Sequence, residues 1–172
     1  MVARKKVEEK VEIIDEDYEN PWYFKGDVFN SSSIGKAHGM IYLIEEISTG
    51  KIYIGQKVLW GTKTRMVNKK KKKIKIESDW KKYYSSSAYI NKQVEEHGVG
   101  DFKRSVLMLV MGDGMLNYME LKIQMLLLVL EDETRYINGY VGGRISRSHY
   151  SKEKIVDFDI DNLNRICPNF PI

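Results

Sequence analysis

The sequence predicts an α+β fold in which a small three-stranded antiparallel sheet is flanked by helices. Two runs of β-branched and aromatic residues, 40–47 and 51–56, flank the turn sequence Ser48-Thr49-Gly50, which is typical of a β-hairpin. A third run, residues 102–110, is apolar enough to lie centrally in the sheet. At 172 residues, the chain is long enough for one sizeable domain and too short for two comfortable ones.

Composition limits the classes of protein that the chain can belong to. An apolar content of 42% argues against wholesale disorder, and the chain lacks a run of about twenty apolar residues that would span a membrane. The charged start is unlike a signal peptide. A single cysteine, Cys167, excludes an internal disulfide and a thiolate metal cluster. We therefore expect a reduced, cytoplasmic protein with no membrane partner.

The ends of the chain differ in character from its middle. Residues 1–19 alternate lysine with acidic residues and predict a flexible tail. Residues 20–38 begin with Asn20-Pro21-Trp22 and two further aromatics, which predict an arm that packs over one side of the sheet. Residues 151–172 predict a tail that forms a short helix or wraps over the domain, so the expected domain itself covers residues 20–150.

A polycationic segment follows the hairpin. Residues 62–82 hold ten Lys or Arg against Glu77 and Asp79, a local net charge of +8 that leaves −4 on the rest of a chain whose total is +4. This asymmetry favours a polyanionic partner, although a solvated loop that only aids solubility has the same composition. We expect residues 61–76 to form a basic insert that is a loop, and aromatic residues to border it. The candidate nucleic-acid-binding residues are Lys69, Lys70, Lys71, Lys72, Lys73, Lys75, Trp80, Lys81, Lys82 and Tyr83.

The helices are predicted from capping residues and apolar runs. Residues 77–84 predict a short helix, and Ser85-Ser86-Ser87 can cap a second helix over 88–96 that ends before Gly98. The longest helix is expected from Met115 to about Leu130. On it Asn117, Glu120 and Gln124 share one narrow stripe. Glu120 is either a solvated residue on an exposed stripe or a metal ligand, since a stranded buried carboxylate is costly.

Several motifs occur in an order that resembles the GIY-YIG nucleases. Tyr42 and Tyr53 occupy comparable places on the two hairpin strands, where by themselves they fit an ordinary edge hairpin as well. The chain is also similar to a subgroup of small stand-alone endonucleases from tailed bacteriophages over about residues 20–150. The matching segments are Ile41-Tyr42, Tyr53-Ile54-Gly55, the Asn20–Trp22 arm, the lysine-rich insert, Ser78–Tyr84, the 86–104 segment, Tyr118–Glu120 and Ile137–Tyr140.

The resemblance implies a DNA endonuclease that hydrolyses phosphodiester bonds with one divalent cation, Mg²⁺ or Mn²⁺. Glu120 matches the family's catalytic glutamate and would hold the metal. Tyr42 or Tyr53 would activate water, which requires the surrounding Lys and Arg residues and the metal to favour phenolate over a phenol of pKa near 10. Asn138 matches the asparagine motif and is interpreted as a backbone-fixing residue. The candidates for the catalytic cation, in order, are Arg65, Lys63 and Lys57.

Other functions remain open from the sequence. A catalytically silent nucleic-acid-binding protein would use the same basic surface, and an interaction protein would use it to contact an acidic partner. The resemblance alone implies a phage origin, a homing role and a location in the host cytoplasm. Whether the protein acts on DNA as a monomer or a dimer is not determined by the sequence.

Overall fold

A mixed sheet forms the centre of the molecule. The computed structural model describes residues 19–67 and 70–171. The sheet runs in the order β2-β1-β7-β3-β4, and β8 also pairs with β7. Its strands are β1 (Trp22–Phe24), β2 (Asp27–Val28), β3 (Gly39–Glu46), β4 (Ile52–Val58), β7 (Phe102–Val110) and β8 (Ile155–Phe158). The predicted α+β class is therefore confirmed, but the three-stranded sheet is wrong, because this sheet has six strands and β1 runs parallel to β7.

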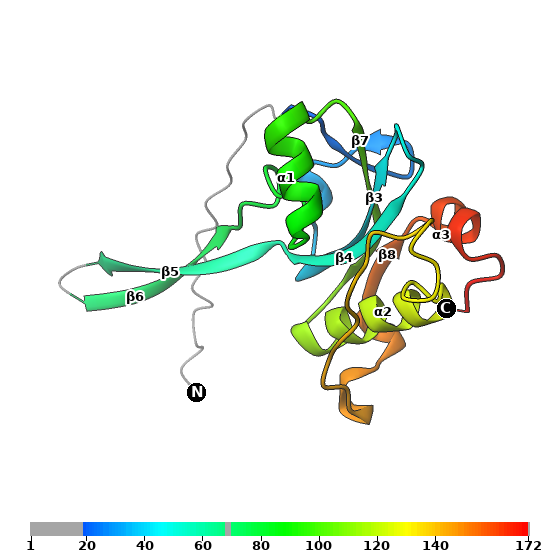
Figure 1. Cartoon of the computed structure of the whole chain (residues 1–172). Coiled ribbons are helices and arrows are strands. Elements are labelled where there is room, and N and C mark those ends of the chain that lie inside the picture. The colour runs from blue at the N-terminus through cyan, green and yellow to red at the C-terminus, as the bar shows by residue number, and fades with distance from the viewer. Residues whose placement is uncertain (1–18, 68–69, 172) are drawn as a thin grey trace.

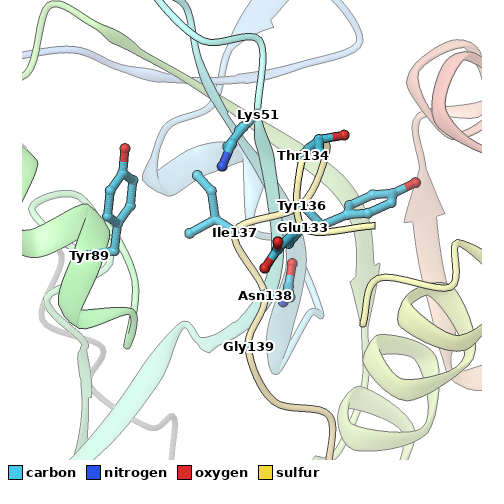
Figure 2. A pocket seen from close by; sticks show the side chains of 8 residues that line it. All are labelled: Lys51, Tyr89, Glu133, Thr134, Tyr136, Ile137, Asn138 and Gly139. Carbon is cyan, nitrogen blue, oxygen red and sulfur yellow. The ribbon is translucent and has the colours of Figure 1, made fainter. Parts of the chain in front are cut away.

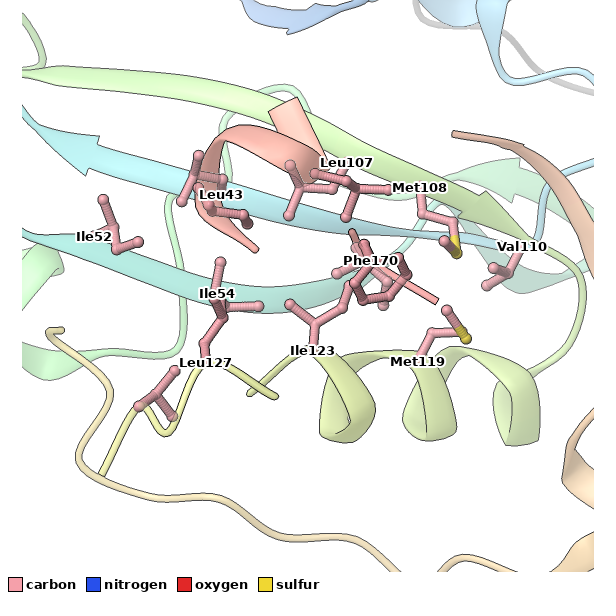
Figure 3. Close-up of a cluster of buried hydrophobic side chains, with 14 of the residues drawn as sticks. Leu43, Ile52, Ile54, Leu107, Met108, Val110, Met119, Ile123, Leu127 and Phe170 are labelled. Atoms are coloured by element: carbon pink, nitrogen blue, oxygen red, sulfur yellow. The ribbon is translucent and has the colours of Figure 1, made fainter. Parts of the chain in front are cut away.

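Helices and the N-terminal arm cover the two faces of this sheet. One face carries α2 (Asp113–Leu126) and α3 (Ile160–Ile166), and the apolar side chains of both helices pack on the strands (Figures 1 and 3). The other face carries α1 (Ala88–His97) and the arm. Short 3₁₀ helices occupy Ser31–Ser33, Arg147–His149 and Lys152–Lys154. None of the described helices combines the length and hydropathy that a membrane span requires.

The β3–β4 hairpin forms where the sequence predicts it. Glu46 and Lys51 close the turn through a backbone hydrogen bond of 2.9 Å, and Gly50 takes a φ of +70°. That left-handed conformation is open to glycine without steric cost. β7 lies between β1 and β3, as its apolar sequence predicts.

The arm joins the sheet as well as covering it. Trp22 of β1 is fully buried and donates from Nε1 to the carbonyl of Trp80 at 2.9 Å. Arg104 of β7 is also fully buried, and its guanidinium donates to the carbonyls of Asn20, Lys81 and Tyr83. This one side chain ties the arm and the segment after the basic insert to the sheet, and sequence reasoning missed it. A lone arginine in an apolar strand was the available signal.

Three local predictions are wrong. The basic insert is not a loop but a hairpin of β5 (Trp60–Val67) and β6 (Lys70–Glu77), which projects from the body (Figure 1). Residues 78–84 form a turn rather than a helix, and the carbonyls of Lys81 and Tyr83 in this turn accept hydrogen bonds from the guanidinium of Arg104. α2 ends at Leu126 because Leu128 takes a φ of +52° and Val129 donates back to Gln124, which is a Schellman-type ending.

The C-terminal segment contributes to the sheet and to the core. β8 pairs with the end of β7, and Asp159 caps α3 by accepting from the backbone of Asn162 at 3.0 Å. Leu163 and Phe170 are buried against the α2 face. Residues 1–18, most of the predicted tail, lie outside the described residues.

Candidate active site

The two hairpin tyrosines lie together on one face of the sheet. Tyr42 pairs with Gly55, and Tyr53 pairs with Ile44, so the two rings are offset by one pleat and stack with centroids 6.2 Å apart. A Cβ atom on Gly55 would lie 2.5 Å from Cζ of Tyr42 and 2.8 Å from Cε1 of Tyr53. Glycine is therefore required at this strand position because the two rings occupy the space above it.

We expect Gly55→Ala to destabilise the fold by about 1–3 kcal/mol, because the added methyl group must displace one of two packed rings. The free energy of unfolding in urea measures this change. Gly100→Ala is the matched control, since nothing lies within 4 Å of a Cβ there. Equal stability of the two variants would show that the rings move aside without cost.

The two phenols differ in accessibility. Tyr42 is 1% exposed, and its ring packs against Trp22 and Tyr83 at centroid distances of 5.1 and 6.1 Å. Tyr53 is only partly buried, and its Oη lies 3.3 Å from Oγ of Ser86. Tyr53 is thus the phenol that solvent can reach.

The protein does not favour phenolate at either tyrosine. Burial is the main cause that raises the pKa of Tyr42 well above 10, and the neighbouring phenols and Glu120 raise it further. Burial also raises the pKa of Tyr53, although the hydrogen bond with Ser86 opposes the change. The protein's own described groups therefore do not lower the pKa of either phenol, and stabilisation of phenolate together with a metal stays a prediction.

Glu120 lies on α2 beside the free edge of β4. Its carboxylate accepts a hydrogen bond from the backbone N–H of Gln56, and its charge raises the pKa of both Tyr42 and Tyr53. Burial raises the pKa of Glu120 to about 7, and the Gln56 hydrogen bond opposes this only in part. Among the described residues, no lysine or arginine forms an ion pair with it.

The whole polar stripe of α2 faces this strand edge. Asn117 accepts from Nε2 of Gln56 at 2.6 Å, and Gln124 donates to the carbonyl of Ile54 at 3.0 Å. Asn138 completes the edge, because its amide accepts from the N–H of Ile54 at 2.9 Å and donates to its carbonyl at 2.8 Å. The alternative of a solvated, exposed stripe is therefore wrong.

One family model matches most of the chain. The family described as "Putative endonuclease segE, GIY-YIG domain" matches residues 22–141. The chain belongs to this family. The match includes both tyrosines, Gly55, Glu120 and Asn138, and ends before β8. No curated protein and no solved structure matches the chain.

In this GIY-YIG domain, Lys57 is the candidate cation nearest the tyrosines. Its Nζ lies 3.8 Å from the ring centroid of Tyr83, which itself contacts Tyr42, and 2.6 Å from Oδ1 of Asp79. Arg65, ranked first from the sequence, and Lys63 lie instead on the projecting hairpin (Figure 1). Arg65 is five residues from Trp60, or about 17 Å along a strand. The structure does not bring it to the tyrosines.

The candidate nucleic-acid-binding residues fall into two groups. Lys70 to Lys73 and Lys82 are exposed, and Lys75 lies with Nζ 4.3 Å from the ring centroid of Trp60. Trp80 is fully buried and Lys81 is 8% exposed, so the GIY-YIG domain does not present Trp80 for base stacking. Tyr83 is partly buried beside Tyr42, and Lys69 lies outside the described residues.

Two hollows lie beside opposite ends of β4. One of about 500 Å³ is lined by Gln56, Lys57, Trp60 and Asn117, among others. Another of about 610 Å³ lies at the opposite end of β4. Figure 2 shows that Lys51, just before β4, Tyr89 of α1 and the segment 133–139, which includes Asn138, border it. Among the described residues, Tyr42, Tyr53 and Glu120 line neither hollow.

The residues fit a magnesium ion better than a transition metal. Among the described residues, no group of three or more His, Cys, Asp or Glu side chains is placed to hold a metal. Mg²⁺ needs only one or two carboxylates, because it retains waters and binds substrate phosphates. Glu120 is such a carboxylate, and Oε1 of Gln56 is a buried acceptor with no hydrogen-bond partner among the described residues. The GIY-YIG domain therefore offers one charged ligand and a buried neutral acceptor on the adjacent strand.

The pKa of Glu120 predicts a pH dependence of stability in the absence of metal. The pKa is about 7 in the folded protein against an ordinary 4.5, so the folded protein retains a proton that the unfolded chain releases. This contribution to stability is complete below about pH 4.5 and is lost as the pH rises through 7. We expect the melting temperature, measured in EDTA, to fall from pH 5 to pH 8 relative to Glu120→Gln. Parallel curves for the two proteins would contradict the assignment.

Proposed function

We propose that this protein is a Mg²⁺-dependent endonuclease that hydrolyses phosphodiester bonds of DNA. The observation that carries the proposal is a half-buried carboxylate, Glu120, held at a strand edge beside two tyrosines, with which no lysine or arginine among the described residues forms an ion pair. Membership of a GIY-YIG endonuclease family supports the reaction class. We assign the nuclease unit to residues 20–150, with residues 151–172 packed on it.

Glu120 is proposed as the metal ligand. A bound Mg²⁺ or Mn²⁺ would supply Lewis-acid polarisation of a phosphoryl oxygen and neutralise charge that develops in the transition state. The Gln56 N–H fixes one carboxylate oxygen, so the carboxylate keeps its orientation when the metal is absent. Asn138 acts on the same strand from further away, by holding both backbone groups of Ile54.

Tyr53 is proposed as the residue that orients the attacking water. Its hydroxyl donates to Ser86 in the arrangement that leaves its oxygen lone pairs free to accept from water. The water oxygen bonds to phosphorus as the bond from phosphorus to the 3′ oxygen breaks. Tyr42 is too buried to meet water, and we assign it to holding the Tyr53 ring by stacking.

Lys57 is proposed as the cation that stabilises charge on the non-bridging oxygens. Its ammonium group lies on the tyrosine face of β4, and it can exchange Asp79 for a phosphate. Exposed Asp79 is a weak competitor, because surface ion pairs contribute little in water. Electrostatic stabilisation of this kind is commonly the largest single contribution to catalysis.

The second candidate function is a silent nucleic-acid-binding protein. The absence of Arg65 and Lys63 from the tyrosine cluster favours it, since the site then relies on one lysine held by an aspartate. The basic hairpin would bind DNA equally well in either case.

Incubation of supercoiled plasmid with the protein, with Mg²⁺ or with EDTA, tests the proposal. We expect nicking or linearisation only with Mg²⁺. A salt-sensitive mobility shift without cleavage would identify the silent binder. Failure both to bind and to cut would instead favour a protein whose basic surface contacts an acidic partner. The ratio of nicked to linear product also reports whether the two strands are cut together.

A further inference from the structure

The basic hairpin is a two-stranded ribbon anchored at its base. β5 and β6 pair over eight rungs, from Trp60 opposite Glu77 to Val67 opposite Lys70. Nε1 of Trp60 donates to the carbonyl of Ala37 at 3.0 Å, which fixes the first rung to the arm. Beyond this base the ribbon extends away from the sheet for about 24 Å, seven steps at the usual rise of a strand (Figure 1).

Positive charge lies on both strands and both faces of this ribbon. Residues that face each other across an antiparallel pair share a face, so the register assigns each cation. Lys63, Arg65, Lys70 and Lys72 lie on one face, whereas Lys71, Lys73 and Lys75 lie on the other. The cations are exposed except for Lys75, which is partly buried over Trp60. The ribbon therefore presents cations to anions on more than one side.

We propose that this ribbon lies in the major groove of duplex DNA, with β5 along one phosphate wall and β6 along the other. The major groove is about 12 Å wide and admits a two-stranded ribbon, whereas the minor groove, at about 6 Å, does not. A single strand or a membrane surface would meet the cations of one face only. The proposal deepens the proposed function, on which it rests for its choice of DNA as the polyanion.

The chemistry of the ribbon predicts anchoring without strong sequence selection. Lysine contacts to phosphates set position and affinity but carry no sequence information. Like charges stand opposite each other at the Arg65–Lys72 rung, which disfavours the pairing in water and favours it between phosphates. The active site at the base of the ribbon would then cut next to the groove segment that the ribbon occupies.

The test measures binding in EDTA, so that cleavage plays no part. The same duplex is prepared in three forms. The first is unmodified, the second carries bulky groups on pyrimidine C5 that fill the major groove, and the third is saturated with a minor-groove ligand. We expect C5 groups to weaken binding by the full chain at least tenfold and the minor-groove ligand to change it less than threefold. A variant with residues 70–73 changed to Ser should bind the unmodified and the C5-modified duplex with the same affinity. The slope of log affinity against log salt concentration should be smaller by roughly 3–4 than for the unaltered protein.

Two further variants control for folding and total charge. Replacing residues 70–73 by Arg should restore binding and its sensitivity to C5 groups. Removing the same charge from the body, at Lys36, Lys92, Lys103 and Lys152, should leave that sensitivity intact. Equal binding of filled and open major grooves by the unaltered protein would overturn the proposal, as would equal affinity for single strands. If the protein binds filled and open grooves equally but cuts plasmid, the major-groove placement is wrong and the proposed nuclease function is retained. If binding depends on the major groove but the protein never cuts, the placement is retained and the nuclease function is wrong.

Discussion

Glu120→Gln is expected to abolish Mg²⁺-dependent cleavage while DNA binding persists. The substitution removes the only charged ligand that the site offers among the described residues, but leaves an amide oxygen that can accept from the Gln56 N–H. Loss of metal-based charge stabilisation costs about 4 kcal/mol, or roughly 10³-fold in the rate of cleavage. The rate of plasmid nicking at saturating Mg²⁺ measures it.

The design separates a missing ligand from a damaged fold. The substitution replaces a carboxyl group whose pKa is raised to about 7 by burial. Above that pH it removes a negative charge from a partly buried position, so the variant should be at least as stable as the parent. Glu131→Gln, an exposed substitution beyond the end of α2, is the matched control and should cut normally. Affinity for DNA in EDTA should not fall. Cleavage by Glu120→Gln at the parental rate would remove Glu120 from the mechanism.

The parts of the site that are predictable from sequence are those set by local periodicity. Alternation along two strands joined by a short turn places Tyr42 and Tyr53 on one face, and the register shows them stacked there. Helical spacing likewise places Asn117, Glu120 and Gln124 in one line. The sequence does not predict that this line of side chains faces the β4 edge, because that depends on where α2 packs in the tertiary structure.

The parts that are not predictable depend on partners distant in sequence. Arg104 holds the turn at residues 78–84 by donating to the carbonyls of Lys81 and Tyr83, which lie more than twenty positions before it in the chain. Burial of Trp80 follows from its contact with Trp22 and Phe29 on the arm, so an aromatic beside a lysine run is core here rather than a stacking platform. The basic insert has the composition of a loop, yet its alternating Thr, Lys and Ile residues pair as strands.

The second large effect is expected from replacing the proposed catalytic cation, Lys57. We expect Lys57→Met to lower the rate constant for cleavage by about 10²–10³-fold, the usual effect of removing one preorganised donor to developing negative charge. Lys57 is one of several cations near DNA, so the dissociation constant should change less than threefold. Single-turnover cleavage and binding in EDTA measure the two effects separately.

Arg65→Met is the matched comparison, because it removes one cation from the hairpin instead of from β4. It should weaken binding and reduce the salt slope by about 1 without changing the single-turnover rate. Lys57→Arg should retain most activity, since a guanidinium supplies the same charge with more donors. The opposite pattern, a slow Arg65→Met and a normal Lys57→Met, would mean that the ribbon folds back over the tyrosines when DNA is bound. Both the major-groove placement and the assignment of Lys57 as the catalytic cation would then be wrong, because one ribbon cannot lie in the groove and over the tyrosines at once.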